Sequence, residues 1–177
     1  MQKVLLLILS LVTLLGCSNG TKFKNGNLSQ KNVDKIKTEL NIPYSTFSKG
    51  YEKMDAEILT DSYTADALLI NVYNGIEPKS FKGEKNILNF FSENLERAKR
   101  ENLRIKATFK ITNRKIMGEA ILDNGYYKLE ILTPNQNINE RYGKFSIVLK
   151  QESGEWKFSV DTNASSNQKE YQDAESI

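Results

Sequence analysis

Apolar side chains recur at helical spacing between residues 29 and 63, which predicts helices in this part of the chain. A first helix is expected to begin at Ser29 or Asn32 and to contain Pro43. Because proline lacks a backbone N–H, we expect the helix to kink or restart there. Asp55 is placed to cap a second, short helix. The apolar face of the first helix consists of Val33, Ile36, Leu40, Tyr44, Phe47, Tyr51 and Met54.

A third helix and a series of strands are predicted in the rest of the chain. An apolar strand from Ala67 to Tyr73 comes first, and the third helix then carries one apolar stripe. From Leu103 the apolar spacing changes to two, which is typical of a strand with one solvated face. The stripe of the third helix consists of Ile87, Phe90, Phe91, Leu95 and Ala98. Three further strands are expected over residues 119–133, 142–151 and 155–163, with a hairpin turn at residues 152–155.

The order of these elements, with helices first and long strands afterwards, is typical of α+β proteins. We expect a cone-shaped, curved antiparallel sheet packed against about three N-terminal helices. Such a cone leaves a pocket between the concave face of the sheet and the helices. The length of 177 residues suits a single domain.

The first sixteen residues have the pattern of an export signal. Lys3 precedes an apolar run from Val4 to Leu15, and this run of twelve residues is shorter than the roughly 20 that a membrane-spanning helix needs. The run ends in Leu-Leu-Gly-Cys at residues 14–17, which resembles the lipobox of bacterial lipoproteins. The resemblance implies lipidation of Cys17 and attachment to a membrane of the bacterial cell envelope, with the domain outside the cytoplasm. An ordinary signal peptide that happens to contain a cysteine is the alternative.

These features divide the chain into four segments. A signal peptide is expected over residues 1–16 and a flexible, polar tether over 17–30. The folded domain is expected over 31–164, and the polar tail over 165–177 is predicted to be disordered.

Composition excludes several classes of function. The chain has 25 Lys and Arg against 22 Asp and Glu, a net charge of +3 that does not indicate a nucleic-acid partner. It has one cysteine, so no intrachain disulfide can form, and it has no histidine. The absence of histidine excludes Ser-His and Cys-His catalytic systems and the usual zinc sites. We expect no metal and no cofactor.

Four stretches in succession resemble the nuclear transport factor two-like superfamily, in its branch of SnoaL-like and calcium/calmodulin-dependent kinase association-like domains. The resemblance covers Ile36 to Ala164 and implies a cystatin-like cone. Enzymes of this superfamily, such as ketosteroid isomerases and polyketide cyclases, hold an aspartate base and tyrosine donors inside an apolar cone. The matching residues are Phe47, Tyr51, Lys53 to Leu59 and Tyr63 to Ala67; Gly83, Glu84, Ile87, Phe90 and Phe91; Gly118, Gly125 and Tyr127; and Gly143 to Phe145, Val148 to Lys150, Gly154, Trp156 to Phe158 and Asp161.

Three residues are weak candidates for catalysis. On an unbroken strand, Asp123 and Tyr127 share a face and could supply a base and a hydroxyl donor. However, residues 123–125 also have the composition of a turn or bulge, which would turn Asp123 outward. Asp161 alternates with Phe158 and Val160, and simple parity therefore turns it away from their face.

Six aromatic residues are candidates for lining a ligand pocket, although aromatic stripes of this kind also form plain core. They are Tyr51, Tyr63, Tyr73, Phe90, Phe109 and Tyr127. Because no recognisable catalytic set is present, we expect binding rather than catalysis. The hypothesis is a lipid-anchored envelope protein that binds a small apolar or amphipathic ligand in the cone, or that acts as a dimeric accessory module through its exposed sheet face. One alternative is a small isomerase or cyclase with an aspartate base, and another is a purely structural or accessory subunit.

The lipoprotein hypothesis predicts the behaviour of a Cys17→Ser variant. Without the acceptor thiol no lipid can be attached, so the protein should move from the membrane fraction to the soluble fraction after cell lysis. Immunoblotting of the two fractions measures this directly. Persistent membrane association of the variant would contradict lipid anchoring.

Overall fold

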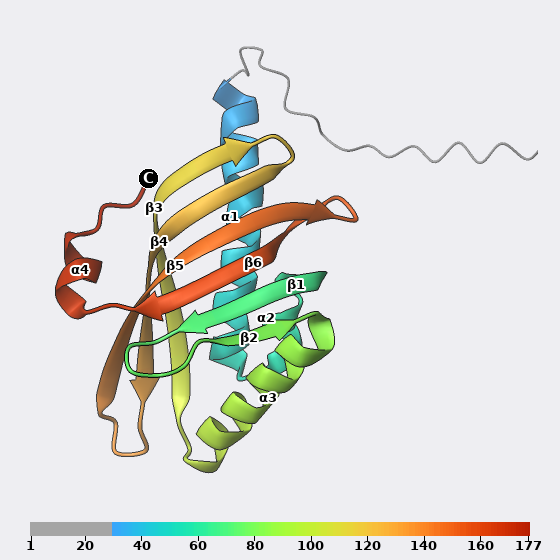
Figure 1. Cartoon of the computed structure of the whole chain (residues 1–177). Helices are drawn as coiled ribbons and strands as arrows, with labels where there is room; N and C mark the ends of the chain where they lie inside the picture. Colours follow the sequence, from blue (N-terminus) through green and yellow to red (C-terminus); the bar gives the residue numbers. More distant parts are fainter. Residues whose placement is uncertain (1–29) are drawn as a thin grey trace, which may run out of the picture.

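The structure is a computed structural model in which residues 30–177 are described, with side-chain surroundings from Ile36 onward. Cys17, the expected signal and almost all of the expected tether lie outside the described residues. The chain is α+β, as the sequence predicts (Figure 1). Its elements are α1 (Gln30–Lys53), α2 (Ala56–Thr60), β1 (Tyr63–Val72), β2 (Lys79–Lys82), α3 (Glu84–Arg100), β3 (Arg104–Met117), β4 (Ala120–Leu132), β5 (Ile138–Glu152), β6 (Glu155–Ser165) and α4 (Gln168–Asp173).

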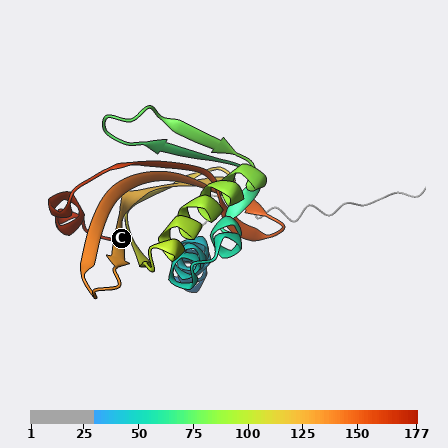
Figure 2. The same ribbon diagram turned by 90° about the horizontal axis from the view of Figure 1, so that it is seen from below.

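The six strands form one curled sheet in the order β2-β1-β6-β5-β4-β3. Figure 2 shows the sheet bending around α1, α2 and α3, which lie on its concave side. The expectation of a purely antiparallel sheet is wrong at one place, because β1 and β6 pair in parallel. Hairpins join β3 to β6 in succession and impose antiparallel pairing, whereas the long connection from β1 to β6 imposes none. The turn expected at residues 152–155 is present, with positive φ at both Ser153 and Gly154.

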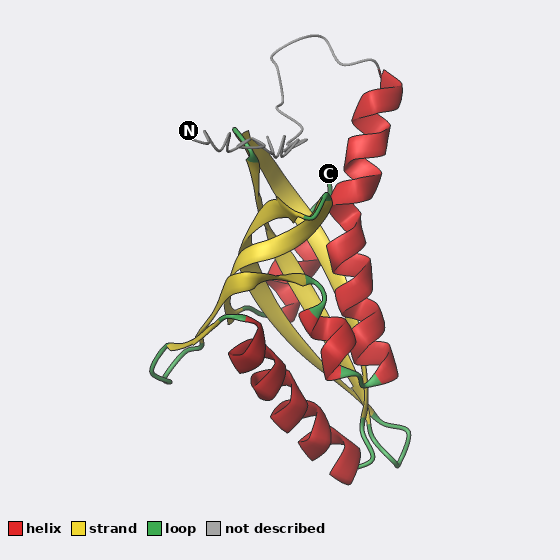
Figure 3. Ribbon diagram, turned by 90° about the vertical axis from the view of Figure 1, so that its right-hand side faces the viewer, coloured by secondary structure: helices red, strands yellow, loops and turns green. Residues whose placement is uncertain are grey.

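Helix α1 runs along one side of the sheet without interruption (Figure 3). Of the kink or restart expected at Pro43, the restart does not occur, because the helix continues through the proline. Pro43 is buried together with its neighbours Leu40 and Tyr44, and the packing of this face offsets the lost backbone hydrogen bond.

Asp55 caps α2 as predicted, since its side chain accepts hydrogen bonds from the backbone N–H groups of Glu57 and Ile58. No helix within residues 30–177 is long and apolar enough to cross a membrane.

The core is built around Phe47 on α1. Its ring lies edge-on to five other aromatic rings, at centroid distances from 5.3 to 6.0 Å. Each such pair contributes about 0.5–1.5 kcal/mol beyond the area that it buries. The five rings belong to Tyr51, Tyr63, Phe91, Phe109 and Phe158, so that α1 is joined to α3 and to both halves of the sheet.

Two bulges change which residues face the core. In β6, Val160 pairs with Val148 and Phe158 pairs with Leu149, so that Ser159 is an extra residue. In β3, Thr112 is extra in the same way, opposite β4. Each bulge reverses the inward and outward alternation of the strand beyond it.

The C-terminal tail is folded, and the prediction of disorder for residues 165–177 was wrong. Helix α4 contacts β4 and β5 on the side of the sheet opposite α1 to α3 (Figure 2). Tyr171 is buried there, and Lys110 lies over its ring while donating hydrogen bonds to the carbonyls of Tyr171 and Ala174. The backbone N–H of Ile177 also donates to the carbonyl of Ile111. The polar composition of the tail gave no indication of these two contacts. One is the packing of Tyr171 on the sheet, and the other is the binding of Lys110 to the carbonyls at the end of the helix.

Candidate functional site

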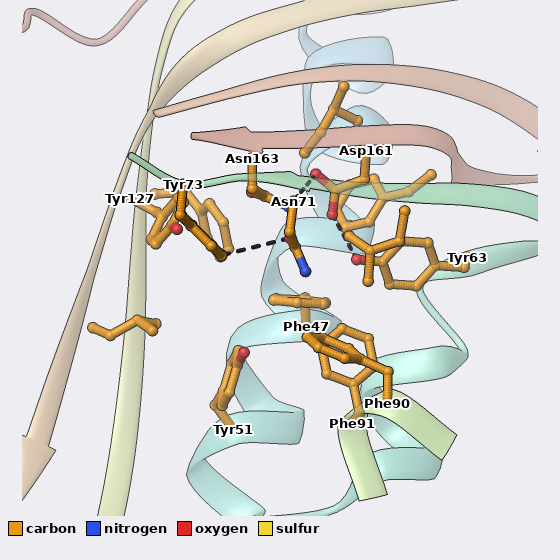
Figure 4. A pocket seen from close by; sticks show the side chains of 15 residues that line it. Phe47, Tyr51, Tyr63, Asn71, Tyr73, Phe90, Phe91, Tyr127, Asp161 and Asn163 are labelled. Carbon is orange, nitrogen blue, oxygen red and sulfur yellow. Dashed lines mark hydrogen bonds between the residues drawn. The ribbon is translucent and has the colours of Figure 1, made fainter. Parts of the chain in front are cut away.

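A cavity of about 80 Å³ lies between the concave face of the sheet and helices α1 and α3 (Figure 4). This volume is several times what one water molecule needs. All six aromatic residues that the sequence singled out, Tyr51, Tyr63, Tyr73, Phe90, Phe109 and Tyr127, line this one cavity. Phe47, Phe91 and Phe158 complete most of the apolar wall. The polar residues of the lining, apart from the tyrosine hydroxyls, are Asn71, Asp161 and Asn163.

Asp161 is the acidic group of the cavity, and it points inward, contrary to the parity expected from sequence. The extra residue Ser159 turns Asp161 onto the same face as Phe158. The residue is only 3% exposed. The Tyr63 hydroxyl donates to Oδ2 at 2.6 Å and the Asn163 Nδ2 donates to Oδ1 at 3.0 Å. Burial raises the pKa of this carboxyl to about 6, although the two hydrogen bonds act in the opposite direction.

The tyrosine hydroxyls around Asp161 remain protonated and can donate hydrogen bonds. Burial is the largest cause that raises the pKa of Tyr51, Tyr63 and Tyr127, and the nearby Asp161 raises each of them further. The Tyr73 hydroxyl interacts with that of Tyr127, which raises the pKa of Tyr127, and it donates a long hydrogen bond of 3.5 Å to the Oδ1 of Asn71. Tyr73 is 37% exposed and therefore lies where the cavity meets solvent.

Gly143 on β5 fixes the place of the Tyr127 ring. The two residues are cross-strand partners, and a Cβ at position 143 would lie 2.1 Å from Cζ of the tyrosine. The Tyr127 ring and its hydroxyl thus lie directly over the glycine backbone, and Tyr127 forms part of the cavity lining. Any larger residue at position 143 would displace this wall of the cavity.

Asp123 lies outside the cavity. Strand β4 is regular through residues 123–125, so the bulge expected there is absent and Asp123 faces inward with no exposed surface. It lies under α1, where the Tyr44 hydroxyl donates to it at 2.8 Å and Arg114 donates two hydrogen bonds at 2.7 Å each. Tyr127 is four residues further along, or about 13 Å on an extended strand. The proposed pairing of an Asp123 base with a Tyr127 donor is therefore wrong, and Asp123 belongs to the framework.

Sequence reasoning missed three polar residues. Arg114 faces inward because of the Thr112 bulge, which the period-two pattern of β3 gave no reason to expect. Asn71 and Asn163 are direct partners on the parallel strands β1 and β6, and both line the cavity. The signal that could have found Asn71 is its position as a polar interruption in an otherwise apolar strand.

The lining can accept a proton at one carboxylate and donate hydrogen bonds from several hydroxyls and amides, within a largely aromatic wall. Among the side chains described from Ile36 onward, no three or more Asp, Glu or Cys side chains come together in a way that could hold a metal ion.

Comparison with known proteins identifies the architecture. No protein-family model matches the chain, and no curated protein matches it. Solved structures do match: an NTF2-like protein of unknown function from Shewanella oneidensis is 15% identical, with 73% of this chain and 98% of the other covered and a TM-score of 0.58. An NTF2-like protein with a cystatin-like fold from Novosphingobium aromaticivorans is 11% identical, with 81% and 94% covered and a TM-score of 0.62. ActVI-ORFA from Streptomyces coelicolor is 12% identical, with 73% and 96% covered and a TM-score of 0.63.

The fold is NTF2-like. Identities this low establish the NTF2-like fold and no activity, because one fold carries many unrelated functions. In this NTF2-like cone, the site consists of Asp161 and the hydroxyls that face it.

The raised pKa of Asp161 predicts a pH dependence of stability. Because the folded protein holds this proton more tightly than the unfolded chain, the contribution to stability is complete below about pH 4 and is lost as the pH rises through about 6. The free energy of unfolding of the wild type should therefore fall by about 3 kcal/mol over this window relative to that of Asp161→Asn, which has no proton to lose. Urea unfolding at a series of pH values measures the difference.

The matched control is Asp173→Asn, which removes an exposed carboxylate on α4. Its unfolding free energy should follow that of the wild type across the window. Parallel pH profiles for the wild type and Asp161→Asn would show that the Asp161 pKa is not raised on folding.

Proposed function

We propose that this protein binds a small, predominantly apolar ligand in its cone cavity. The observation that carries the proposal is the cavity itself, in which aromatic walls surround a few convergent polar groups (Figure 4). This combination is typical of small-molecule sites. A cone that served only as a scaffold would more simply be filled by its own side chains.

The polar groups of the cavity support binding in a defined orientation. Asp161 is held from two sides, by Tyr63 and by Asn163, so its direction is fixed before any ligand arrives. Tyr73 and Tyr127 stand across the cavity from it in Figure 4. A ligand between them would meet a carboxylate at one end and hydroxyls at the other.

We further propose that the protein acts at the bacterial cell envelope, anchored by lipid on Cys17. The Leu-Leu-Gly-Cys sequence at residues 14–17 after a short apolar run supports this placement. We also propose that the domain forms a homodimer.

Native mass spectrometry of the mature chain, Cys17 to Ile177 made without its lipid, tests both ligand binding and assembly. We expect a dimer that carries a co-purified small molecule, which is released on denaturation and identified by its mass. Leu129→Trp, which adds bulk to the lining, serves as the comparison and should lose the adduct. An empty monomer would contradict both the ligand and the homodimer.

A second function, proton transfer, is favoured by one observation. Asp161 has a pKa of about 6, and a carboxylate of this kind in an aromatic cavity can act as a base near neutral pH. Such an enzyme would remove a proton next to a carbonyl group, while hydroxyl donors stabilise the developing negative charge. Asp161 takes the role first considered for Asp123.

The proton-transfer hypothesis predicts hydrogen exchange in a carbon acid. In heavy water, the α-hydrogens of phenylacetone should exchange for deuterium faster with the protein than without it, as followed by proton NMR. Asp161→Asn should lower the rate by about 100-fold or more, because it removes the base. If exchange in the presence of the wild type is no faster than in buffer alone, catalysis on this class of substrate is contradicted.

A further inference from the structure

Among the described residues, the carboxylate of Asp161 has no basic partner. Its hydrogen-bond donors, Tyr63 and Asn163, are neutral. No lysine or arginine is among the described residues that line the cavity. An ionised carboxylate in such surroundings is costly unless a positive charge accompanies it.

The other buried aspartate, Asp123, has its charge balanced by a residue of the protein itself. Asp123 is bound by both Nε and Nη2 of Arg114, at 2.7 Å each, and no part of it is exposed. The arginine supplies the compensating charge within the protein. Asp161 is equally buried but faces a cavity instead of a guanidinium.

The walls of the cavity suit a cation as well. Besides Asp161 itself, the lining carries phenylalanine and tyrosine rings from α1, α3 and the sheet. The face of an aromatic ring attracts a positive charge, and cages of such rings bind organic ammonium groups. Phe47, Tyr51, Tyr63, Phe91 and Phe158 provide such rings in the lining, and Tyr63 lies directly beside Asp161.

We propose that the occupant of the cone is a small organic ammonium ion, whose positive charge pairs with Asp161 while its carbon groups lie against the aromatic wall. This inference rests on the proposed ligand-binding function and specifies the chemical class of the ligand. Carboxylates and phosphates are excluded, because they would meet a like charge and no cation.

The charge state of the cavity near neutral pH depends on Asp161. The titratable groups that face it are Tyr51, Tyr63, Tyr73 and Tyr127, and burial raises the pKa of each, so all four stay neutral. Asp161, with its pKa of about 6, is ionised above this value and neutral below it. Affinity for a cation should therefore rise as the pH passes through about 6, because the carboxylate forms there.

A pair of probes of nearly identical shape tests this inference. Choline carries a permanent positive charge, and 3,3-dimethylbutan-1-ol has carbon in place of its nitrogen. Binding of both to the mature chain, Cys17 to Ile177, is measured by isothermal titration calorimetry. We expect choline to bind about tenfold or more tightly than the alcohol at about pH 7.5. Its affinity should fall roughly tenfold between about pH 7.5 and pH 5, while that of the alcohol stays constant.

Asp161→Asn should lower the preference for choline over the alcohol to that supplied by the aromatic wall alone, because the variant lacks the carboxylate. Asp173→Asn, which alters a carboxylate outside the cavity, should behave as the wild type in both titrations. The pH dependence of choline binding needs no variant, since the charge of choline does not change with pH. It therefore tests the inference even if Asp161→Asn fails to fold.

The other outcomes distinguish failure of the ammonium inference from failure of the proposed ligand-binding function. Equal affinities for the two probes, or tighter binding of the alcohol, would overturn the ammonium inference and leave the apolar-ligand function standing. An affinity for choline that does not change between these pH values would also overturn it. Failure of the wild type to bind either probe would count against both.

Discussion

One extra residue in β6 determines the chemistry of the cone. Ser159 is unmatched in the pairing of β6 with β5, and the alternation of side chains reverses there. Phe158 before the bulge and Asp161 and Asn163 after it consequently line the same cavity. In a regular strand, Asp161 would face the opposite side of the sheet, and the cone would hold aromatic rings without a carboxylate. The bulge in this one strand is thus the reason that the cone contains a polar site and not only an apolar core.

The two buried aspartates on the inward face of the sheet have different roles: Asp123 supports the fold, and Asp161 lines the cavity. Asp123, Arg114 and Tyr44 connect β4, β3 and α1 through short hydrogen bonds, and this network is complete within the protein. Asp161 is held in direction by Tyr63 and Asn163, yet no cation among the described lining residues balances its charge. Removing Asp123 or Arg114 would leave a buried charge without its partner and weaken the packing of α1 on the sheet. Changing Asp161 would instead alter which ligands the cavity can bind.

Periodicity was sufficient to predict the fold class, the main helices, the later strands and the six aromatic residues of the lining. Its errors arose where tertiary structure overrides local pattern. Pro43 remains inside α1 because its buried neighbours hold the helix together, and Tyr171 orders a polar tail by packing on the sheet. The bulges at Ser159 and Thr112 leave no mark on the apolar pattern, so the inward turn of Asp161 and of Arg114 could not be derived from it.

The length of α1 has a consequence for access to the cavity. The described chain starts with Gln30 at one end of this helix, and Phe47, which lines the cavity, lies seventeen residues further on. At the rise of an α-helix this is a rigid separation of about 26 Å. If the lipid is attached at Cys17, α1 is a spacer of fixed length, and the cavity lies toward the end of the spacer away from the anchor. Ligand exchange and anchoring then use different parts of the molecule.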